Sequence, residues 1–144
     1  MSQPEIYPMP LFVTLTVADL TASQRWYEAI GFKTVFAMAS QDGTGVFAHL
    51  RWMRYADLLL RPSVGSQAHK GLGVTINFRV EHDIDALARH AKAEGANIIA
   101  EVADRPWNAR EFTLMDPDGF TLTFTYGPLQ ERDFEAVMRG ALRT

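Results

Sequence analysis

The chain carries one pattern of predicted elements twice, with an offset of about 64 residues. A strand-like run over residues 11–17 precedes a helical pattern that ends at Gly31. A second run over residues 74–80 precedes a helical pattern that ends at Gly95, 64 positions later. Strand-like residues 57–60 and 121–124 share the same offset. The repeat therefore predicts two copies of one unit, each built as strand, helix and further strands.

The predicted strands alternate between apolar and polar side chains. Val13, Leu15 and Val17 alternate with Phe12, Thr14 and Thr16. The same alternation separates the two faces of residues 74–80, where Asn77 lies among the polar positions, and of residues 121–125, where Thr123 does. Each sheet should pack its apolar face against a helix. The other face can contact a ligand or simply solvent.

Capping residues support the helices. Thr21 and Gln24 can form a capping box for the first helix, and Asp83 or Asp85 can cap the second. Residues 131–142 predict a third, amphipathic helix that covers a sheet edge or a subunit boundary.

Composition excludes several classes of protein. The formal charge of −3 argues against a nucleic-acid-binding protein, and the absence of cysteine excludes disulfides and thiolate metal sites. No apolar run approaches the roughly 20 residues that span a bilayer. The first ten residues contain three prolines and no basic segment, unlike a signal peptide. We expect a cytoplasmic protein that binds neither nucleic acid nor membrane.

Several motifs resemble a known superfamily. They are Val17-Ala18-Asp19-Leu20 leading to Trp26-Tyr27-Glu28, then Arg105-Pro106-Trp107, Arg110-Glu111-Phe112 and Asp116-Pro117-Asp118-Gly119. The pattern resembles the vicinal oxygen chelate proteins, the glyoxalase, bleomycin-resistance and dioxygenase superfamily. Pro-Trp is similar to the start of a Pro-Trp-Gly motif in bleomycin-resistance proteins, but Asn108 stands in place of the glycine.

The resemblance implies an α+β fold in a single domain over residues 1–144. Two βαβββ modules, at about 11–62 and 72–126, would form a curved, cupped mixed sheet with helices on the convex face. A C-terminal helical extension would occupy residues 129–143. Members are commonly dimers, so we expect a homodimer.

The resemblance also locates the positions where metal-dependent members hold their ion. In this chain those positions are Phe12, Leu59, Thr75 and Thr123. Phenylalanine and leucine have no donor atom, and a neutral threonine hydroxyl is a poor ligand beside carboxylate or imidazole. We therefore expect no metal, no cofactor and no catalytic residue, in the manner of the non-metal members that sequester antibiotics.

The predicted function is sequestration of an antibiotic-like, cationic or aromatic small molecule in an aromatic-lined cleft. The candidate ligand-binding residues are Phe12, Thr14, Phe47, His49, Trp52, Leu59, Asn77, Trp107, Arg110, Phe112 and Thr123. Each has a plainer interpretation: Trp107 could close the core, Arg110 could pair with Glu111 or Asp104, and His49 could be a packing residue.

Two other functions stay open at this point. A metal-dependent lyase, isomerase or dioxygenase could use His49, Asp57 and Glu111, although their spacing is irregular. Alternatively, the chain could be a dimeric domain with an interaction role, whose cupped sheet holds no ligand. The sequence does not identify the ligand.

Overall fold

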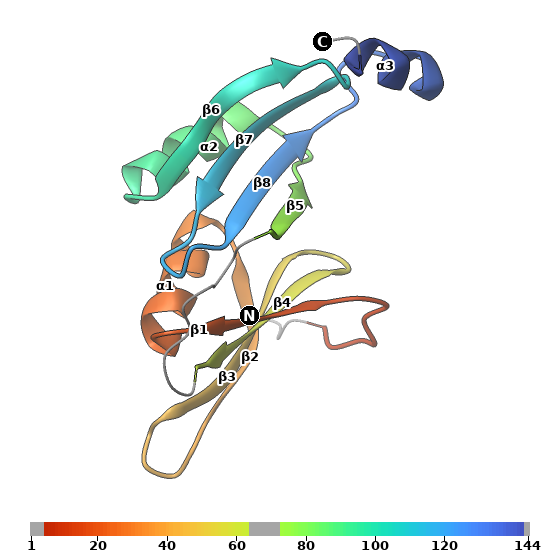
Figure 1. Ribbon diagram of the computed structural model, residues 1–144. Helices are drawn as coiled ribbons and strands as arrows, with labels where there is room; N and C mark the ends of the chain where they lie inside the picture. The colour runs from red at the N-terminus through yellow and green to blue at the C-terminus, as the bar shows by residue number, and fades with distance from the viewer. Residues whose placement is uncertain (1–4, 64–72, 143–144) are drawn as a thin grey trace. The chain divides into compact units, whose positions relative to one another are not determined.

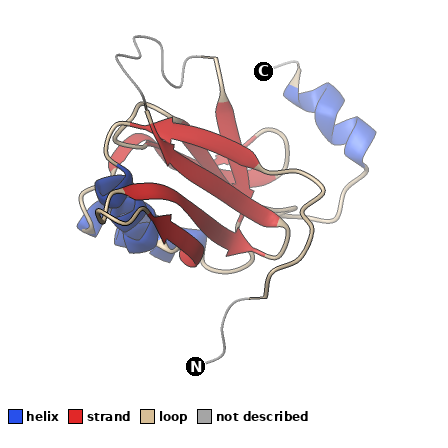
Figure 2. Cartoon of the chain, turned by 90° about the horizontal axis from the view of Figure 1, so that it is seen from below, coloured by secondary structure: helices blue, strands red, loops and turns tan. Residues whose placement is uncertain are grey.

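The computed structural model describes residues 5–63 and 73–142. The chain divides into two compact units, Met1–Lys70 and Gly71–Thr144, which we call the N-terminal and C-terminal modules. Each module contains a four-stranded sheet (Figures 1 and 2). Among the helices of the described residues, none is long and apolar enough to cross a membrane.

The N-terminal module has the order strand, helix, three strands. Its elements are β1 (Val13–Val17), α1 (Leu20–Ile30), β2 (Lys33–Ala39), β3 (Gly45–Met53) and β4 (Ala56–Pro62). The sheet order is β1-β4-β3-β2, with β1 parallel to β4 and the other pairs antiparallel. Helix α1 packs on β2, β3 and β4.

The C-terminal module repeats this topology and adds a helix. Its elements are β5 (Thr75–Arg79), α2 (Ile84–Ala93), β6 (Asn97–Arg105), β7 (Ala109–Met115), β8 (Thr121–Tyr126) and α3 (Phe134–Ala141). The sheet order is β5-β8-β7-β6, with β5 parallel to β8. The predicted α+β fold, with two βαβββ modules and a C-terminal helix, is confirmed (Figure 1).

Each module buries its own apolar core between one sheet face and one helix. Tyr27 and Ile30 of α1 are buried with Leu50, Leu58 and Leu60 of the sheet. In the C-terminal module the Phe124 ring stacks between Phe78, at 5.3 Å, and Phe112, at 5.2 Å. Ile84, Ala88 and Ala91 form the buried stripe of α2. The period-two pattern thus identified the helix-facing sides of the central strands correctly.

Some element ends differ from the sequence prediction. β1 begins at Val13, two residues later than expected, so Phe12 precedes the strand. Val74 precedes β5 and is half exposed, although alternation placed it on the apolar face. Backbone pairing with β4 and β8, which starts at Val13 and Thr75, sets these boundaries.

Aspartates cap the three helices found in residues 5–63 and 73–142. Asp19 accepts a hydrogen bond from the Ala22 backbone N–H at 3.1 Å, so the predicted Thr21–Gln24 capping box is wrong. The helix begins one residue before Thr21, and the Gln24 side chain instead donates to the Thr34 hydroxyl at 3.0 Å. Asp83 caps α2, as one of the two predicted alternatives.

Candidate functional site

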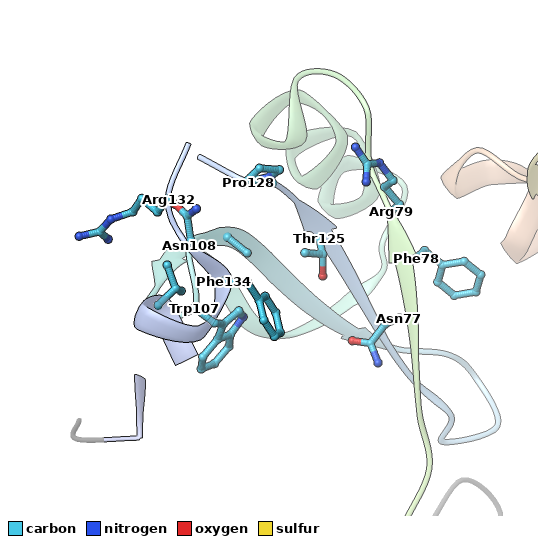
Figure 3. A pocket seen from close by; sticks show the side chains of 12 residues that line it. Asn77, Phe78, Arg79, Trp107, Asn108, Thr125, Pro128, Arg132 and Phe134 are labelled. Carbon is cyan, nitrogen blue, oxygen red and sulfur yellow. The ribbon is translucent and has the colours of Figure 1, made fainter. Parts of the chain in front are cut away.

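A cavity with a volume of about 640 Å³ lies in the C-terminal module. Its size is that of a small-molecule site. Strands β5 and β8, the turn before β7, the segment after β8 and helix α3 all contribute to its wall (Figure 3). The lining residues are Asn77, Phe78, Arg79, Trp107, Asn108, Ala109, Thr125, Gly127, Pro128, Arg132, Phe134 and Val137.

Strand register builds the polar floor of this cavity. Asn77 and Arg79 lie two residues apart on β5 and share the sheet face away from the core. Arg79 pairs in register with Thr125 of β8, so both side chains lie on that face. In Figure 3, Asn77 and Thr125 point toward the same space as the Phe134 ring, whereas the Phe78 ring points away from it.

A shared carboxylate oxygen fixes the orientation of Trp107. The indole Nε1–H donates to Glu111 Oε2 at 3.2 Å, and the Thr125 hydroxyl donates to the same oxygen at 2.9 Å. The Trp107 residue remains 44% exposed, so it does not close the core. Its polar edge is held by the sheet while its ring surface is left for contact with a ligand.

Asn108 connects this turn to the chain that leads into α3. Its side-chain amide donates to the Gln130 carbonyl at 2.7 Å, and its side-chain oxygen accepts from the Gln130 N–H at 3.1 Å. Asn108 has φ 65°, a left-handed conformation that asparagine tolerates better than most residues. Asn108 occupies the position at which the Pro-Trp-Gly motif has glycine, a residue that adopts this conformation readily.

Close backbone approach favours glycine at position 127, beside that turn. A Cβ atom at Gly127 would lie 3.1 Å from the Asn108 carbonyl oxygen and 3.4 Å from the Ala109 Cα. The approach brings the segment after β8 against the Trp107 turn, where Pro128 and Arg132 line the cavity.

Helix α3 forms the wall opposite the sheet. Asp133 caps it by accepting from the Ala136 N–H at 3.0 Å. Val137 is the buried residue of the helix, whereas Phe134 is 76% exposed and reaches over the cavity. The helix begins three residues later than predicted, and one of its faces covers a ligand-sized space on the sheet.

The open face of the N-terminal sheet carries a buried ionic cluster. The Asp57 side chain has no exposed surface and accepts from His49 Nε2 at 2.7 Å and from Arg51 Nε and Nη2 at 2.8 and 2.9 Å. Hydrogen bonds to Asp57 raise the pKa of Arg51 above its ordinary value. The Arg51 guanidinium also lies 4.3 Å from the centre of the Tyr7 ring.

The predicted site residues fall into two groups that belong to different modules. In the N-terminal module, Leu59 pairs in register with Thr14 and His49, which places the three on one sheet face. Phe47, two residues before His49 on β3, shares that face. In the C-terminal module, Thr123 pairs with Asn77 and Thr113, and its hydroxyl lies 2.8 Å from that of Thr113. Phe12 precedes β1 and is half exposed.

Three predicted site residues lie on the helix-facing sides of the sheets instead. Phe112 has no exposed surface and stacks on Phe124 in the core, so it offers nothing to a ligand. Trp52 packs near the C-terminal end of α1, with its ring 5.2 Å from that of Phe32.

Arg110 faces the helix as well. Its guanidinium binds both oxygens of Asp85 at 2.7 and 3.0 Å and Asp104 at 2.9 Å. Hydrogen bonds from Arg110 lower the pKa of Asp85 below its ordinary value. Arg110 is therefore an ion-pairing residue, in agreement with its plainer interpretation. Its main partner, however, is Asp85 of α2.

Sequence reasoning missed much of the cavity wall. Arg79 and Thr125 lie on the polar face that alternation had already identified, two residues beyond Asn77 and Thr123. Phe134 and Val137 belong to the amphipathic pattern over residues 131–142, which gave no indication that the helix would face a cavity.

The residues at the four metal positions do not fit a divalent cation. Phe12 and Leu59 provide no donor atom, and the Thr123 hydroxyl is engaged with that of Thr113. The described part of the chain holds no cluster of three or more His, Cys, Asp or Glu side chains suited to a metal ion. No chemical step through a metal can be derived from this donor set.

Comparisons with known proteins identify similar chains. The model of the Glyoxalase/Bleomycin resistance protein/Dioxygenase superfamily matches residues 11–124. No curated protein sequence matches the chain.

Solved structures extend the comparison. TioX from Micromonospora sp. ML1 is 23% identical, covering 81% of this chain and 96% of its own, with a TM-score of 0.68. A glyoxylase/bleomycin resistance protein/dioxygenase domain from Frankia sp. EAN1pec is 25% identical, covering 85% of this chain and 93% of its own, with a TM-score of 0.67. A family enzyme from Burkholderia phytofirmans PsJN is 19% identical, covering 80% and 95%, with a TM-score of 0.63.

Proposed function

The chain belongs to the Glyoxalase/Bleomycin resistance protein/Dioxygenase superfamily, and we propose that it binds an aromatic, antibiotic-like small molecule without a metal ion. The ligand is sequestered rather than transformed. It occupies the cavity of the C-terminal module, with Trp107 and Phe134 as its aromatic contacts. Asn77 and Thr125 provide the polar contacts.

The observation that carries this proposal is the chemistry of the cavity wall. Two aromatic side chains, a proline and Val137 provide apolar surface, and a small number of polar groups converge from the sheet. Small-molecule sites generally combine an apolar lining with a few placed polar groups. Since Glu111 holds the indole edge of Trp107, the ring is oriented before a ligand arrives, which reduces the entropy lost on binding.

A metal-dependent lyase, isomerase or dioxygenase is the less favoured alternative. The candidate ligands for such an enzyme were His49, Asp57 and Glu111. His49 and Asp57 bind each other, and Arg51 takes both Asp57 oxygens. Glu111 belongs to the other module and binds Trp107 and Thr125. Each of the three groups is therefore already held by protein partners.

A thermal-shift assay distinguishes the proposed binder from an interaction domain with an empty site. Bleomycin and a panel of planar aromatic compounds are added to the protein. A compound that binds the native state stabilises it by about 2.7 kcal/mol at a hundredfold excess over its dissociation constant. We expect at least one planar aromatic compound to raise the melting temperature; if none does so at millimolar concentration, the proposed function is wrong.

The substitution Trp107→Ala tests the site itself. We expect the affinity for that compound to fall by about tenfold or more, since an aromatic stacking partner is lost. The melting temperature should change little because Trp107 is 44% exposed. Isothermal titration calorimetry measures the affinity.

Phe36→Ala provides a matched control for Trp107→Ala. Phe36 is an aromatic residue with the same exposed fraction, 44%, but it lies on β2 in the other module. Its substitution should leave the affinity unchanged. Equal losses for both variants, or a large loss of stability with intact affinity for Trp107→Ala, would contradict the assigned site.

The homodimer and the cytoplasmic location also remain proposals. Exposed apolar side chains on β2 and β3, among them Phe36, Met38 and Val46, would suit a contact between two copies. Sedimentation equilibrium of the purified protein tests the dimer directly.

A further inference from the structure

We infer that the open face of the N-terminal sheet holds a second binding site, which takes a hydroxylated aromatic compound and accepts a hydrogen bond from its hydroxyl at His49 Nδ1. This site goes beyond the proposed function, because it lies in the other module and shares no residue with the C-terminal cavity. Two observations carry it: a buried carboxylate holds the imidazole, and apolar side chains lie beside that imidazole on the sheet.

Asp57 fixes the orientation of the His49 ring. The distance from His49 Nε2 to Asp57 Oδ2 is 2.7 Å, and the Asp57 side chain has no exposed surface. Arg51 binds both oxygens of the same carboxylate, at 2.8 and 2.9 Å, which keeps the carboxylate in one position. The imidazole is therefore oriented before a ligand arrives, which reduces the entropy lost on binding.

Hydrogen-bond chemistry determines which nitrogen of His49 a ligand meets. A carboxylate paired with arginine only accepts hydrogen bonds, so Nε2 carries the hydrogen that is donated to Asp57. In a neutral imidazole the other nitrogen, Nδ1, is then an acceptor. Within residues 5–63 and 73–142 the His49 side chain makes its hydrogen bond to Asp57, and 24% of that side chain is exposed. His49 thus offers an acceptor to a ligand.

Apolar side chains lie on both sides of this acceptor. Leu59 of β4 and Phe36 of β2 are the register partners of His49. Phe47 lies two residues before His49 on the same face of β3, and the Phe36 ring supports it, with ring centres 5.7 Å apart. An aromatic ligand can pack on Phe47 and Leu59 while a hydroxyl on its ring reaches Nδ1.

The same arrangement disfavours other ligand groups. A carboxylate or an ether would bring an acceptor against Nδ1, which is itself an acceptor. An ammonium group can donate, but it would bring a cation to a sheet face that also carries Arg51 and Arg61. A phenolic hydroxyl donates a hydrogen bond without adding a positive charge.

Two probes with the same ring test the inference: 2-naphthol, which can donate a hydrogen bond, and 2-methoxynaphthalene, which cannot. Both are titrated into the whole protein at about pH 8, where imidazole in solution is neutral. Amide resonances in two-dimensional ¹H–¹⁵N NMR spectra give a separate dissociation constant for each module. We expect shifts at Phe47, His49 and Leu59, and about fivefold tighter binding of 2-naphthol there, the value of one neutral hydrogen bond.

Substitution of His49 connects the preference to this residue. His49→Gln retains a side-chain amide that can donate to Asp57, but it removes the acceptor at the Nδ1 position. The preference for 2-naphthol should fall to about twofold or less, with the affinity for 2-methoxynaphthalene nearly unchanged. Arg61→Gln is the matched control, since Arg61 lies on the same face of β4, two residues after Leu59. It should retain the full preference.

A measurement on the unsubstituted protein does not depend on the folding of a variant. The ¹⁵N resonance of His49 Nδ1 should shift when 2-naphthol is added and stay in place when 2-methoxynaphthalene is added. A resonance that responds equally to both probes would overturn the assigned hydrogen bond.

The remaining outcomes separate this site from the proposed function. Equal affinities of the two probes for the N-terminal sheet, a preference that persists in folded His49→Gln, or its loss in Arg61→Gln would overturn the inference. Amide shifts confined to the residues around Trp107 would also overturn it, while supporting the proposed function. Shifts at Phe47, His49 and Leu59 without any around Trp107 would support the second site, and the thermal-shift panel would then decide the proposed function by itself.

Discussion

At the scale of single residues, Asp57 is a buried carboxylate that depends on its neighbours. Its side chain is fully buried, and it is bound by His49 and by two nitrogens of Arg51. Removing one partner of a buried ion pair leaves the other charge without compensation. Asp57→Ala should therefore lower the free energy of unfolding by about 3 kcal/mol in a urea titration.

Asp104→Ala is the matched control for that substitution. Asp104 also binds an arginine, Arg110, but its side chain is 64% exposed. Exposed ion pairs contribute about 1 kcal/mol or less. If the two substitutions lower the free energy of unfolding equally, burial of the Asp57 cluster does not account for its contribution to stability.

The position of a residue along its strand predicted which sheet face it lies on better than its residue type did. Alternation placed Asn77 and Thr123 on one face, and their register pairing agrees. Phe112 was selected for its aromatic ring, although it shares a strand face with Leu114, and both are fully buried. Applying the period of two to every candidate would have moved Arg110 and Phe112 to the helix-facing side together.

At the scale of elements, α3 is the helix whose order should affect the ligand most. It carries Phe134 and Val137 of the cavity wall, and Asp133 caps it. Asp133→Ala removes a cap worth about 1 kcal/mol. We expect a planar aromatic compound that binds in this cavity to bind up to about fivefold more weakly, with little change in the melting temperature.

The same substitution in α2 should have the opposite profile. Asp83 caps α2 through the Ala86 N–H, and that helix is packed on the core by Ile84, Ala88 and Ala91. Asp83→Ala should lower the melting temperature and leave the affinity unchanged. If Asp133→Ala acts like Asp83→Ala, then α3 stabilises the module instead of shaping the site.

Local sequence signals predicted the elements well and their ends less well. The repeat fixed the number and type of elements because each strand and helix has its own apolar period. The boundaries of β1 and β5 depend on pairing with strands more than 40 residues away in the chain, which no local window contains. The role of α3 depends on Asn108 holding Gln130, another contact between distant segments.

At the scale of the whole molecule, the two modules present equivalent rows of residues with different chemistry. Leu59 lies between Thr14 and His49 in one sheet, and Thr123 lies between Asn77 and Thr113 in the other. Neither row offers the carboxylates or paired imidazoles that hold a divalent cation. The duplication therefore preserves the scaffold while the donor set differs from that of a metal site.

Ligand binding should accordingly be independent of metal ions. We expect a planar aromatic compound that binds in the cavity to bind with the same affinity before and after treatment of the protein with EDTA. Added zinc should not raise the melting temperature. Stoichiometric zinc, nickel, iron or manganese in the purified protein, together with loss of binding on chelation, would contradict the metal-free mechanism.

The hydrogen bond between Trp107 and Glu111 means that the cavity cannot be remodelled one residue at a time. Exchanging the indole for a smaller ring would enlarge the cavity but leave a carboxylate oxygen facing the new space with Thr125 as its remaining side-chain donor. That oxygen would repel acidic ligands. A variant designed for bulkier acids would therefore need Trp107 and Glu111 changed together, with glutamine as the natural neutral replacement for Glu111.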